Sequence, residues 1–342
     1  MRKVASIQTI NSLVPIELPD GGVADNVVLA TFENIAWQCV VKKDDFNVGD
    51  LCVYFEISTQ LPTDNPAFDF VKKGLVKTRR FLGVLSQGLA MPISILPDGE
   101  YADGNDVSGL IGAKPWEPVA ENARLGGEQE GIFPLHIVAK TDQERIQSMP
   151  WILQAMKDTE LEICATEKID GTSSTFYFED GELKVCSRNF IQRRDNGSIY
   201  WKIAEQYKLE TILKNNPELV LQGEIAGPGI QGNPLGLNVH ELFLFDVFNR
   251  EHNTYYGPSV VRGFANWFGT NSAQILYVWN PNEFAKLTIE DLLNLADGKY
   301  NSGKPREGIV IRPKNVSVWS VGLGRYLSFK VISNDFLLKG GN

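Results

Sequence analysis

Lys168 is the first residue whose surroundings suggest chemistry, because it stands two residues before an Asp-Gly turn in the stretch TEKIDGTSSTFYF (166–178). A lysine before such a turn is also an ordinary surface residue of many hairpins. To attack phosphorus, the amine of Lys168 must be neutral. An ordinary lysine, with a pKa of about 10.4, is almost wholly protonated at neutral pH. A chemical role therefore requires nearby groups that lower this pKa, such as a second lysine, here Lys330, or a divalent metal.

Further short polar clusters follow Lys168 at the ends or inner faces of strand-like runs. Each cluster alone also fits a structural role, such as a salt-bridged strand carboxylate or a core aromatic residue. In chain order the clusters are Lys168-Ile169-Asp170-Gly171, Ser187-Arg188-Asn189, Glu224 in LQGEIAG, Phe243 to Asp246 in LFLFDVF, Glu307 in REGIVIRP and Lys330 in LSFKVIS. The occurrence of all six clusters in this order says more about function than any one cluster does alone.

The carboxylates among these residues fit a magnesium site. Asp170, Glu224 and Glu307 offer oxygen ligands, which Mg²⁺ prefers and often binds through its own water shell. An ion held there would neutralise charge on a phosphate. Phe243 and Phe245 project to one face of their strand, and either could stack on a nucleobase, with core packing as the alternative.

The first 110 residues predict a small all-β barrel. Turn-forming residues separate three strand-like runs, VVLATFENIAWQCVVKK, LCVYFEI and RFLGVLSQGLAMPISIL. An OB-like barrel is the expected architecture at this size. We therefore expect a barrel domain over residues 1–111 and a connector rich in Pro, Gly and Glu over 112–150.

Residues 151–342 predict an α+β body with antiparallel sheets and flanking helices. The expected strands are LEICATEKI, STFYFE, ELKVCSR, LVLQGEIAG, LFLFDVFN, GIVIRP and RYLSFKVI. The expected helices are SIYWKIAEQYKLETILKNN, VVRGFANWFG and IEDLLNLADG, and TDQERIQSMPWILQAMKD reads as short helical pieces divided by Pro150. These strands are the elements that must position the polar clusters.

The composition, 43% hydrophobic and 22% charged, is that of a soluble globular protein. No stretch approaches 18 apolar residues and the first residues lack the features of a signal peptide, so we expect no membrane association and a cytoplasmic or nuclear location. The four cysteines contain no C-x-x-C pair and the three histidines have no metal-like spacing, which favours reduced thiols over a structural zinc site.

The net charge of −9 argues against a protein that coats nucleic acid. Two stretches reverse this charge locally, VKKGLVKTRR (71–80) and RNFIQRR (188–194). Such stretches suit a polyanion that is bound over a limited area, and a solvated basic face is the alternative.

The six clusters, in this order, resemble the motifs of the covalent nucleotidyltransferases, which include ATP-dependent DNA and RNA ligases and mRNA capping enzymes. EIAGPGIQGN and the TEK before Ile169 are similar to the RNA-ligase branch. GDLCVYFEISTQLP (49–62), TDQERIQ (141–147) and a barrel placed before the catalytic body resemble the stand-alone RNA ligase family first described in Naegleria. The resemblance covers essentially the whole chain and implies an OB-like barrel followed by an ATP-grasp-like ligase domain.

The resemblance also implies the reaction. Lys168 would attack ATP to form lysyl-AMP, AMP would pass to an RNA 5′-phosphate, and a 3′-hydroxyl would displace it, with Mg²⁺ or Mn²⁺ assisting. The implied partner is a nicked duplex whose 3′-hydroxyl strand is RNA, and a monomer is the expected state. The implied catalytic residues are Lys168, Lys330 and Arg145, and the implied nucleotide-binding residues are Glu167, Lys168, Ile169, Arg188, Glu224, Phe243, Phe245, Glu307 and Lys330.

Some assignments have alternatives. Glu224 could bind the ribose hydroxyls instead of a metal, Arg145 could be a helix-surface arginine, and Arg188 could be a hairpin-surface arginine. Ligases of this superfamily usually end in Lys-x-Lys, whereas this chain has Ser328 two residues before Lys330 and Ile332 two residues after it. Two other functions stay open. One is a DNA ligase or a GTP-dependent capping enzyme, and the other is a non-catalytic RNA-binding repair protein, which the missing cation beside Lys330 favours.

Overall fold

The computed structural model describes residues 3–116, 127–194 and 197–340. The chain divides into two compact units. Unit 1 consists of Met1–Glu117, Ile146–Pro150 and Asn334–Asn342, and unit 2 of Pro118–Arg145 and Trp151–Ser333. The end of the chain therefore belongs to unit 1, whereas the sequence placed it in the catalytic body. Part of the expected connector, residues 117–126, lies outside the described residues.

Unit 1 is built on a five-stranded antiparallel sheet in the order β3-β2-β1-β4-β8. Its strands are β1 (Ala5–Glu17), β2 (Val23–Phe32), β3 (Gln38–Lys42), β4 (Leu51–Phe55) and β8 (Leu89–Pro92). Strand β1 pairs with β4 through its first half and with β2 through its second. The β2 pairing has a register shift between Ile10 and Ser12, next to the changeover, and another between Pro15 and Glu17. A bulged strand shared in this way curls a sheet, as a small barrel requires.

Shorter elements complete unit 1. They are β5 (Thr59–Gln60), which pairs with β9 (Lys114–Pro115), β6 (Arg79–Phe81), which pairs with β7 (Val84–Ser86), and the helices α1 (Ser108–Ile111) and α9 (Asn334–Leu338). The expected all-β body is confirmed. Its core gathers Ile7, Val53, Phe55, Leu61 and Phe68.

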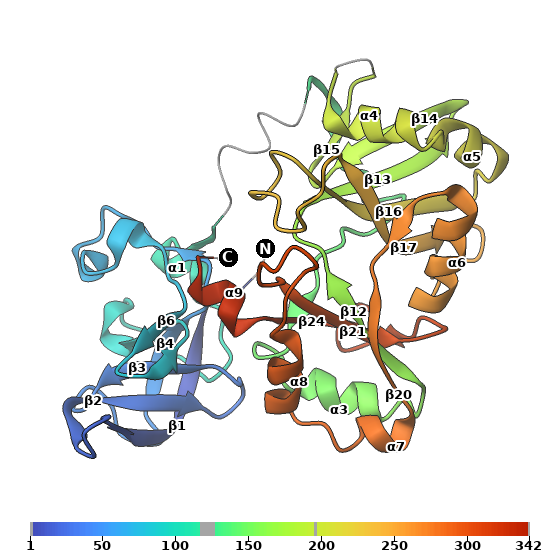
Figure 1. Ribbon diagram of the computed structural model, residues 1–342. Helices are drawn as coiled ribbons and strands as arrows, with labels where there is room; N and C mark the ends of the chain where they lie inside the picture. Colours follow the sequence, from blue (N-terminus) through green and yellow to red (C-terminus); the bar gives the residue numbers. More distant parts are fainter. Residues whose placement is uncertain (1–2, 117–126, 195–196, 341–342) are drawn as a thin grey trace. The chain divides into compact units, whose positions relative to one another are not determined.

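Unit 2 contains an eight-stranded sheet in the order β10-β15-β14-β13-β16-β17-β18, with β19 also paired to β17. The strands are β10 (Gln129–Ile132), β13 (Thr172–Glu179), β14 (Glu182–Ser187), β15 (Phe190–Gln192), β16 (Leu219–Ala226), β17 (Glu241–Asn249), β18 (Thr254–Tyr255) and β19 (Asn271–Ser272). The helices α4 (Ile199–Gln206), α5 (Leu209–Asn215) and α6 (Pro258–Phe268) lie beside β14 and β17 in Figure 1.

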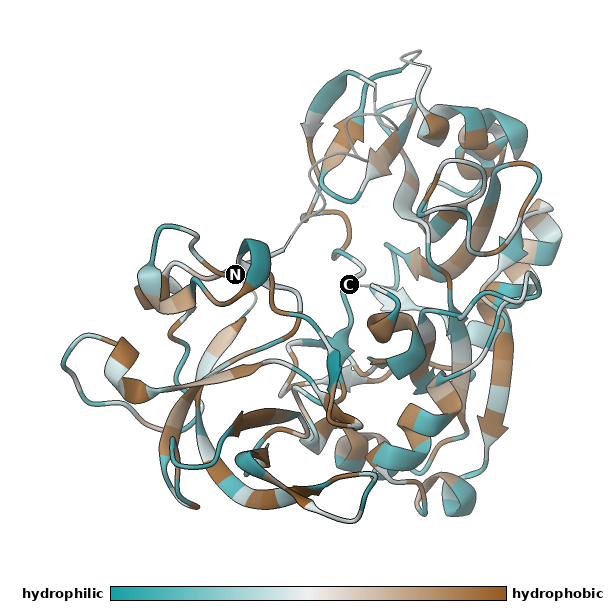
Figure 2. Ribbon diagram, turned by 60° about the vertical axis from the view of Figure 1, so that its left-hand side comes forward, coloured by the Kyte–Doolittle hydropathy of each residue, from teal (hydrophilic) through white to brown (hydrophobic). Residues whose placement is uncertain are grey.

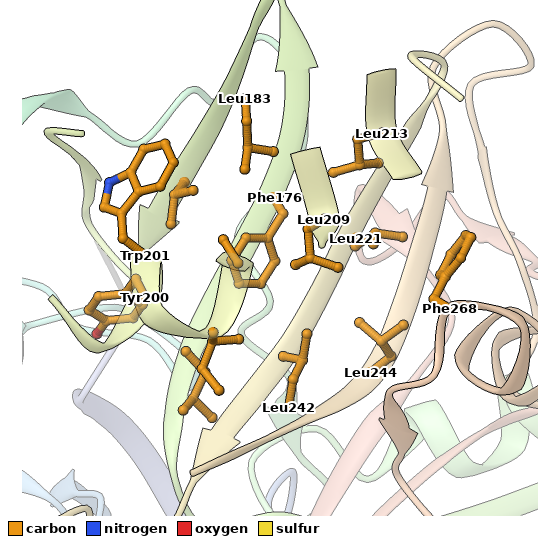
Figure 3. Packing of buried hydrophobic residues seen from close by; sticks show 14 of the residues in the cluster. Phe176, Leu183, Tyr200, Trp201, Leu209, Leu213, Leu221, Leu242, Leu244 and Phe268 are labelled. Carbon is orange, nitrogen blue, oxygen red and sulfur yellow. The ribbon is translucent and has the colours of Figure 1, made fainter. Parts of the chain in front are cut away.

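One face of this sheet packs against those helices. Figure 3 shows Phe176, Leu221 and Leu244 of the strands meeting Leu213 and Phe268 of the helices. Side chains alternate between the faces of a strand, so the neighbours of these core residues project to the opposite face. Glu224 and Phe243 are therefore directed away from the helices.

A second sheet in unit 2 has the order β11-β24-β21-β12-β20. Its strands are β11 (Glu144–Arg145), β24 (Phe329–Ile332), β21 (Gly308–Pro313), β12 (Ile163–Lys168) and β20 (Ile275–Trp279). The remaining elements are α3 (Trp151–Lys157), α7 (Pro281–Phe284), α8 (Ile289–Ala296) and the paired strands β22 (Trp319–Ser320) and β23 (Arg325–Tyr326). Hydrophobic and hydrophilic bands alternate along the helices in Figure 2, as expected for helices with one buried side.

The chain passes from one sheet of unit 2 to the other immediately after Lys168. Strand β12 ends there, and β13 begins at Thr172. Gly171 makes this passage possible, because a Cβ atom at this position would lie 2.3 Å from the carbonyl oxygen of Ile225. A buried ion pair of 2.6 Å between Asp246 of β17 and Arg312 of β21 also joins the two sheets.

Three expected elements differ in the structure. The predicted helix over 198–216 is divided into α4 and α5, because Lys208 adopts a left-handed conformation with φ of 53°. RYLSFKVI forms two separate strands, β23 and β24. The segment TDQERIQ contains strand β11 instead of a helical piece, because Glu144 and Arg145 pair in parallel with β24.

Candidate active site

Lys168 lies at the end of β12 and forms an ion pair with Glu307. The distance from Lys168 Nζ to Glu307 Oε2 is 2.7 Å, and the two side chains are 25% and 12% exposed. In the ladder Lys168 stands opposite Gly308 of β21. A Cβ atom on Gly308 would lie 2.1 Å from the carbonyl oxygen of Val331, and its φ of +154° also favours glycine. The nucleophile candidate is thus largely buried and held by an acid.

The charges around Lys168 favour its ammonium form. Burial alone disfavours this form, but the carboxylates of Glu307, Glu224 and Asp170 outweigh burial and raise the pKa of Lys168 above its ordinary value. The sequence had led us to expect a lowered pKa. The difference arises because three acids, Glu307, Glu224 and Asp170, surround the amine.

The three carboxylates also act on one another. Glu224 lies on β16 opposite Ser173, and its burial, followed by the nearby Glu307 and Asp170, raises its pKa to about 8. Such crowding of acids has a free-energy cost that a bound cation would relieve. In the part of the chain that the structure describes, no three acidic, histidine or cysteine side chains are arranged to bind a metal directly. The carboxylate oxygens of Asp170, Glu224 and Glu307 are of the type that Mg²⁺ prefers, either directly or through its own water shell.

Two further cations share a face with Lys168. Across the sheet, Thr166 of β12 stands opposite Val310 of β21, and Val310 stands opposite Lys330 of β24. Lys330 in turn stands opposite Arg145 of β11. Thr166 is two residues before Lys168 on the same strand. Residues opposite one another in a sheet project to the same face, and so do residues two apart on a strand. Arg145 is 5% exposed and lies on β11, so the alternative of a helix-surface arginine is wrong.

The absent second lysine is thereby accounted for in part. Ser328 precedes β24 and donates a hydrogen bond to Gln143, and Ile332 is buried opposite Gly308. Neither position supplies a cation, whereas Arg145 stands directly beside Lys330. The predicted strand RYLSFKVI contained both Arg325 and Lys330. In the structure Arg325 lies on the separate strand β23 and forms an ion pair with the side chain of Glu144.

A pocket of about 530 Å³ lies beside the Lys168 strand. Glu167 and Ile169, which flank Lys168, line it, as does Phe243 of β17. Among the described residues Phe245 does not line it, and its carbonyl instead accepts a hydrogen bond from Arg312. Of the two phenylalanines that were expected as candidates for stacking on a base, Phe243 is the one that lines the pocket.

Several lining residues were missed by the sequence reasoning. Arg262 and Asn266 come from α6, and Asn271 donates a hydrogen bond of 2.6 Å to Glu241 across the pocket wall. The four-residue spacing of Arg262 and Asn266 places them on one side of α6, away from the buried Val261. This spacing is the sequence pattern from which their shared position could have been predicted. Tyr300, also missed, stands in a loop with no sequence signal.

Arg188 is exposed and forms an ion pair of 2.7 Å with Asp142. It is close enough to lower the pKa of Glu224, although burial dominates that pKa. Its neighbour Asn189 accepts a hydrogen bond from Lys140.

The arginines of the stretch 188–194 are paired with acids, since Arg193 contacts Glu128 and Arg194 contacts Glu210. The stretch 71–80 differs, because Lys72, Lys73, Arg79 and Arg80 are exposed and none of them forms an ion pair within the described ranges. Among the two basic stretches, 71–80 therefore retains more unpaired charge for a polyanion.

Comparisons with known families agree with this arrangement. The RNA ligase family model matches residues 161–332, slightly more than half of the chain. An OB-fold domain model matches residues 4–93. A comparison with curated protein sequences gives no significant match. In the described residues no helix is long and apolar enough to cross a bilayer.

Solved structures of Naegleria gruberi RNA ligase match the whole chain. The structure with PPi is 32% identical, with a TM-score of 0.83 and 99% of each chain covered. A variant with ATP and Mn is 31% identical, with a TM-score of 0.82 and 99% coverage of each chain. A variant with AMP and Mn is 32% identical, with a TM-score of 0.83 and the same coverage. The chain therefore belongs to the RNA ligase family, and its enzyme class is that of the ATP-dependent RNA ligases.

Proposed function

We propose that this protein joins a 3′-hydroxyl to a 5′-phosphate in nicked duplexes whose 3′-hydroxyl strand is RNA, and that it does so through lysyl-AMP on Lys168. The observation that carries the proposal is the placement of the Lys168 amine among Glu307, Glu224 and Asp170, beside a pocket lined by Glu167 and Ile169. A surface lysine of a hairpin would have neither the pocket nor the acids.

ATP is the proposed first substrate. Its adenine would enter the 530 Å³ pocket and stack on Phe243, which would bring the α-phosphate toward Lys168. The amine of Lys168 then forms a bond to the α-phosphorus, and the bond from that phosphorus to the β-phosphate oxygen breaks, releasing pyrophosphate. The relatives determined with ATP and Mn, with AMP and Mn, and with PPi support this order.

Lys168 must lose a proton before this step, since the acids hold it as an ammonium. The residues that would hold a metal through its water shell are Asp170, Glu224 and Glu307, and the ion would supply positive charge that lowers the lysine pKa and neutralises the phosphate. The same carboxylates, once partly neutralised, no longer favour the charged amine. Glu307 keeps the amine oriented through its 2.7 Å contact.

The two later steps are also displacements at phosphorus. An oxygen of the RNA 5′-phosphate bonds to the phosphorus of AMP while the bond to Lys168 breaks. The 3′-hydroxyl oxygen then bonds to the 5′-phosphate phosphorus while AMP leaves. Lys330 and Arg145, on the Lys168 face of the sheet, would stabilise the charge that develops in these transition states.

The basic stretch 71–80 is proposed to contact phosphates, either of the RNA backbone or of the ATP leaving group. Its exposed Lys72 and Lys73, which form no ion pair with the residues that the structure describes, suit either contact, because such cations release counterions when they bind a polyanion. We further propose that the protein works inside the cell, which is supported by four buried free cysteines.

Sealing assays with defined nicks test this function. Duplexes carrying a nick with RNA on the 3′-hydroxyl side should be sealed in the presence of ATP and Mg²⁺, and duplexes with DNA on that side should be sealed much more slowly. Labelling by GTP instead of ATP would indicate a capping enzyme. RNA binding without sealing or labelling would indicate a non-catalytic protein.

A further inference from the structure

Tyr300 lies between the two members of the Lys168–Glu307 pair without belonging to either strand. It starts a tight turn in which its own N–H donates to the carbonyl of Lys304 at 2.9 Å, and it is only 4% exposed. Its hydroxyl donates to the main-chain carbonyl of Lys168 at 2.6 Å and accepts from the main-chain N–H of Glu307 at 3.1 Å. One side chain therefore binds the backbone of both residues.

This hydroxyl replaces a hydrogen bond of the sheet. The last paired residues of β12 and β21 are Lys168 and Gly308, and Glu307 comes just before β21 begins. Beyond that pair the carbonyl of Lys168 and the N–H of Glu307 are bridged by the Tyr300 hydroxyl. The bridge sets the separation of the two backbones at the point where their side chains must meet.

Tyr300 also belongs to the pocket wall. It lines the 530 Å³ pocket together with Glu167 and Ile169, the two neighbours of Lys168 in sequence. Burial, followed by the charge of Glu307, raises the pKa of the hydroxyl, so it remains a hydrogen-bond donor throughout the neutral range. A phenylalanine would preserve the wall of the pocket and remove only the bridge.

We propose that Tyr300 is a positioning residue for lysine adenylylation, whose hydroxyl fixes the backbone of Lys168 relative to that of Glu307 so that the amine is aligned with the α-phosphate. The inference rests on the proposed function and adds a residue to it. Alignment of this kind acts on the rate of the chemical step more than on ATP binding, because small displacements of a nucleophile from its attack geometry are costly.

Single-turnover formation of the AMP adduct tests this role. Tyr300→Phe is compared with the unmodified protein and with Tyr326→Phe, a matched control whose hydroxyl donates to the carbonyl of Asn253 at 2.7 Å. We expect Tyr300→Phe to lower the maximal rate roughly tenfold or more, while the ATP concentration at half-maximal rate changes by less than about threefold. Tyr326→Phe should retain the maximal rate. Thermal unfolding of each variant confirms that it is folded.

A second readout follows the bridge directly. Hydrogen exchange of the Glu307 amide should be faster in Tyr300→Phe and unchanged in Tyr326→Phe, because only the first variant removes its acceptor. An unmodified protein that forms no adduct with ATP overturns the proposed function. An unmodified protein that forms the adduct, together with a Tyr300→Phe variant of equal maximal rate or an equal loss in Tyr326→Phe, overturns the role of Tyr300 alone.

Discussion

At the scale of single residues, the site is defined by one amine surrounded by acids. The acids around Lys168, with Glu307 in contact at 2.7 Å, favour the charged form of the amine. In the proposed reaction the charge of these carboxylates would have to be compensated before the amine could attack phosphorus. Burial, together with the acidic neighbours Glu307 and Asp170, raises the pKa of Glu224 to about 8.

Glu224→Gln is expected to stabilise the metal-free protein at pH 8. The folded-state pKa of Glu224 is about 8, above the usual unfolded value. The folded protein therefore binds the extra proton between these values, and the free energy of unfolding falls as the pH rises through this range. The substitution should remove that loss and raise the free energy of unfolding at pH 8 by up to about 5 kcal/mol, with little effect near pH 4.

Thermal or urea unfolding of the metal-free protein between pH 4 and pH 8 measures this effect. Glu251→Gln, at an exposed position, is the control and should leave the pH dependence unchanged. Equal stability of Glu224→Gln and the unmodified protein at pH 8 would contradict the raised pKa that burial and the neighbouring acids give Glu224. Adding Mg²⁺ should stabilise the unmodified protein more than the variant, because the ion relieves the repulsion.

At the scale of elements, the close approach of β12 and β13 to β16 determines where the acids lie. Gly171 is the residue that allows this approach, since a Cβ atom there would lie 2.9 Å from Glu224 Cγ as well as 2.3 Å from the Ile225 carbonyl oxygen. The passage between the sheets and the position of Glu224 are therefore coupled through one glycine.

Gly171→Ala should destabilise the protein and displace Glu224. We expect a loss of roughly 1–3 kcal/mol in the free energy of unfolding from overpacking, with a loss of adduct formation in the folded fraction. Gly263→Ala in α6 is the matched control, because no atom lies within 4 Å of a Cβ atom there. That control should gain about 0.5–1 kcal/mol, as Ala replaces Gly inside a helix. Urea unfolding distinguishes the two, and equal effects would argue against a tight passage at Gly171.

Much of this element order could be predicted from the sequence. Residues with strong periodic patterns, such as LVLQGEIA and PSVVRGFANWF, form β16 and α6 as expected. Arg145 could not be placed, because its two-residue strand exists only through parallel pairing with β24, which is distant in sequence. Tyr300 could not be identified either, since its role depends on two backbone contacts with residues 132 and 7 positions away.

At the scale of the whole molecule, an acidic protein has to bind a polyanion. The net charge is −9, and the arginines of the stretch 188–194 are paired with acids. The exposed cations of the stretch 71–80, for which the described residues show no ion pair, can attract phosphates at a distance. Substrate binding by this protein should accordingly depend strongly on salt.

Replacing Lys72 and Lys73 by glutamine should weaken RNA binding and reduce its salt dependence. The slope of log affinity against log salt should fall by up to about 2, or about 1 for each lost phosphate contact. Arg193→Gln with Arg194→Gln is the control and should change the slope less, because these side chains are already paired. Titrations of nicked duplex at several salt concentrations measure both. An unchanged slope in the lysine variant would exclude these residues from the RNA contact.

The same lysine variant locates the contact within the reaction. If the stretch 71–80 binds only RNA, adduct formation with ATP alone stays at the level of the unmodified protein. If it holds the triphosphate leaving group, adduct formation falls as well.

The most direct test of the central claim is mass spectrometry of the purified protein after incubation with ATP and Mg²⁺. The account predicts one added AMP, on the peptide that contains Lys168, and its absence in Lys168→Ala. A protein that carries no AMP, or carries it on another lysine in both the unmodified chain and Lys168→Ala, would contradict the assignment of Lys168 as the nucleophile.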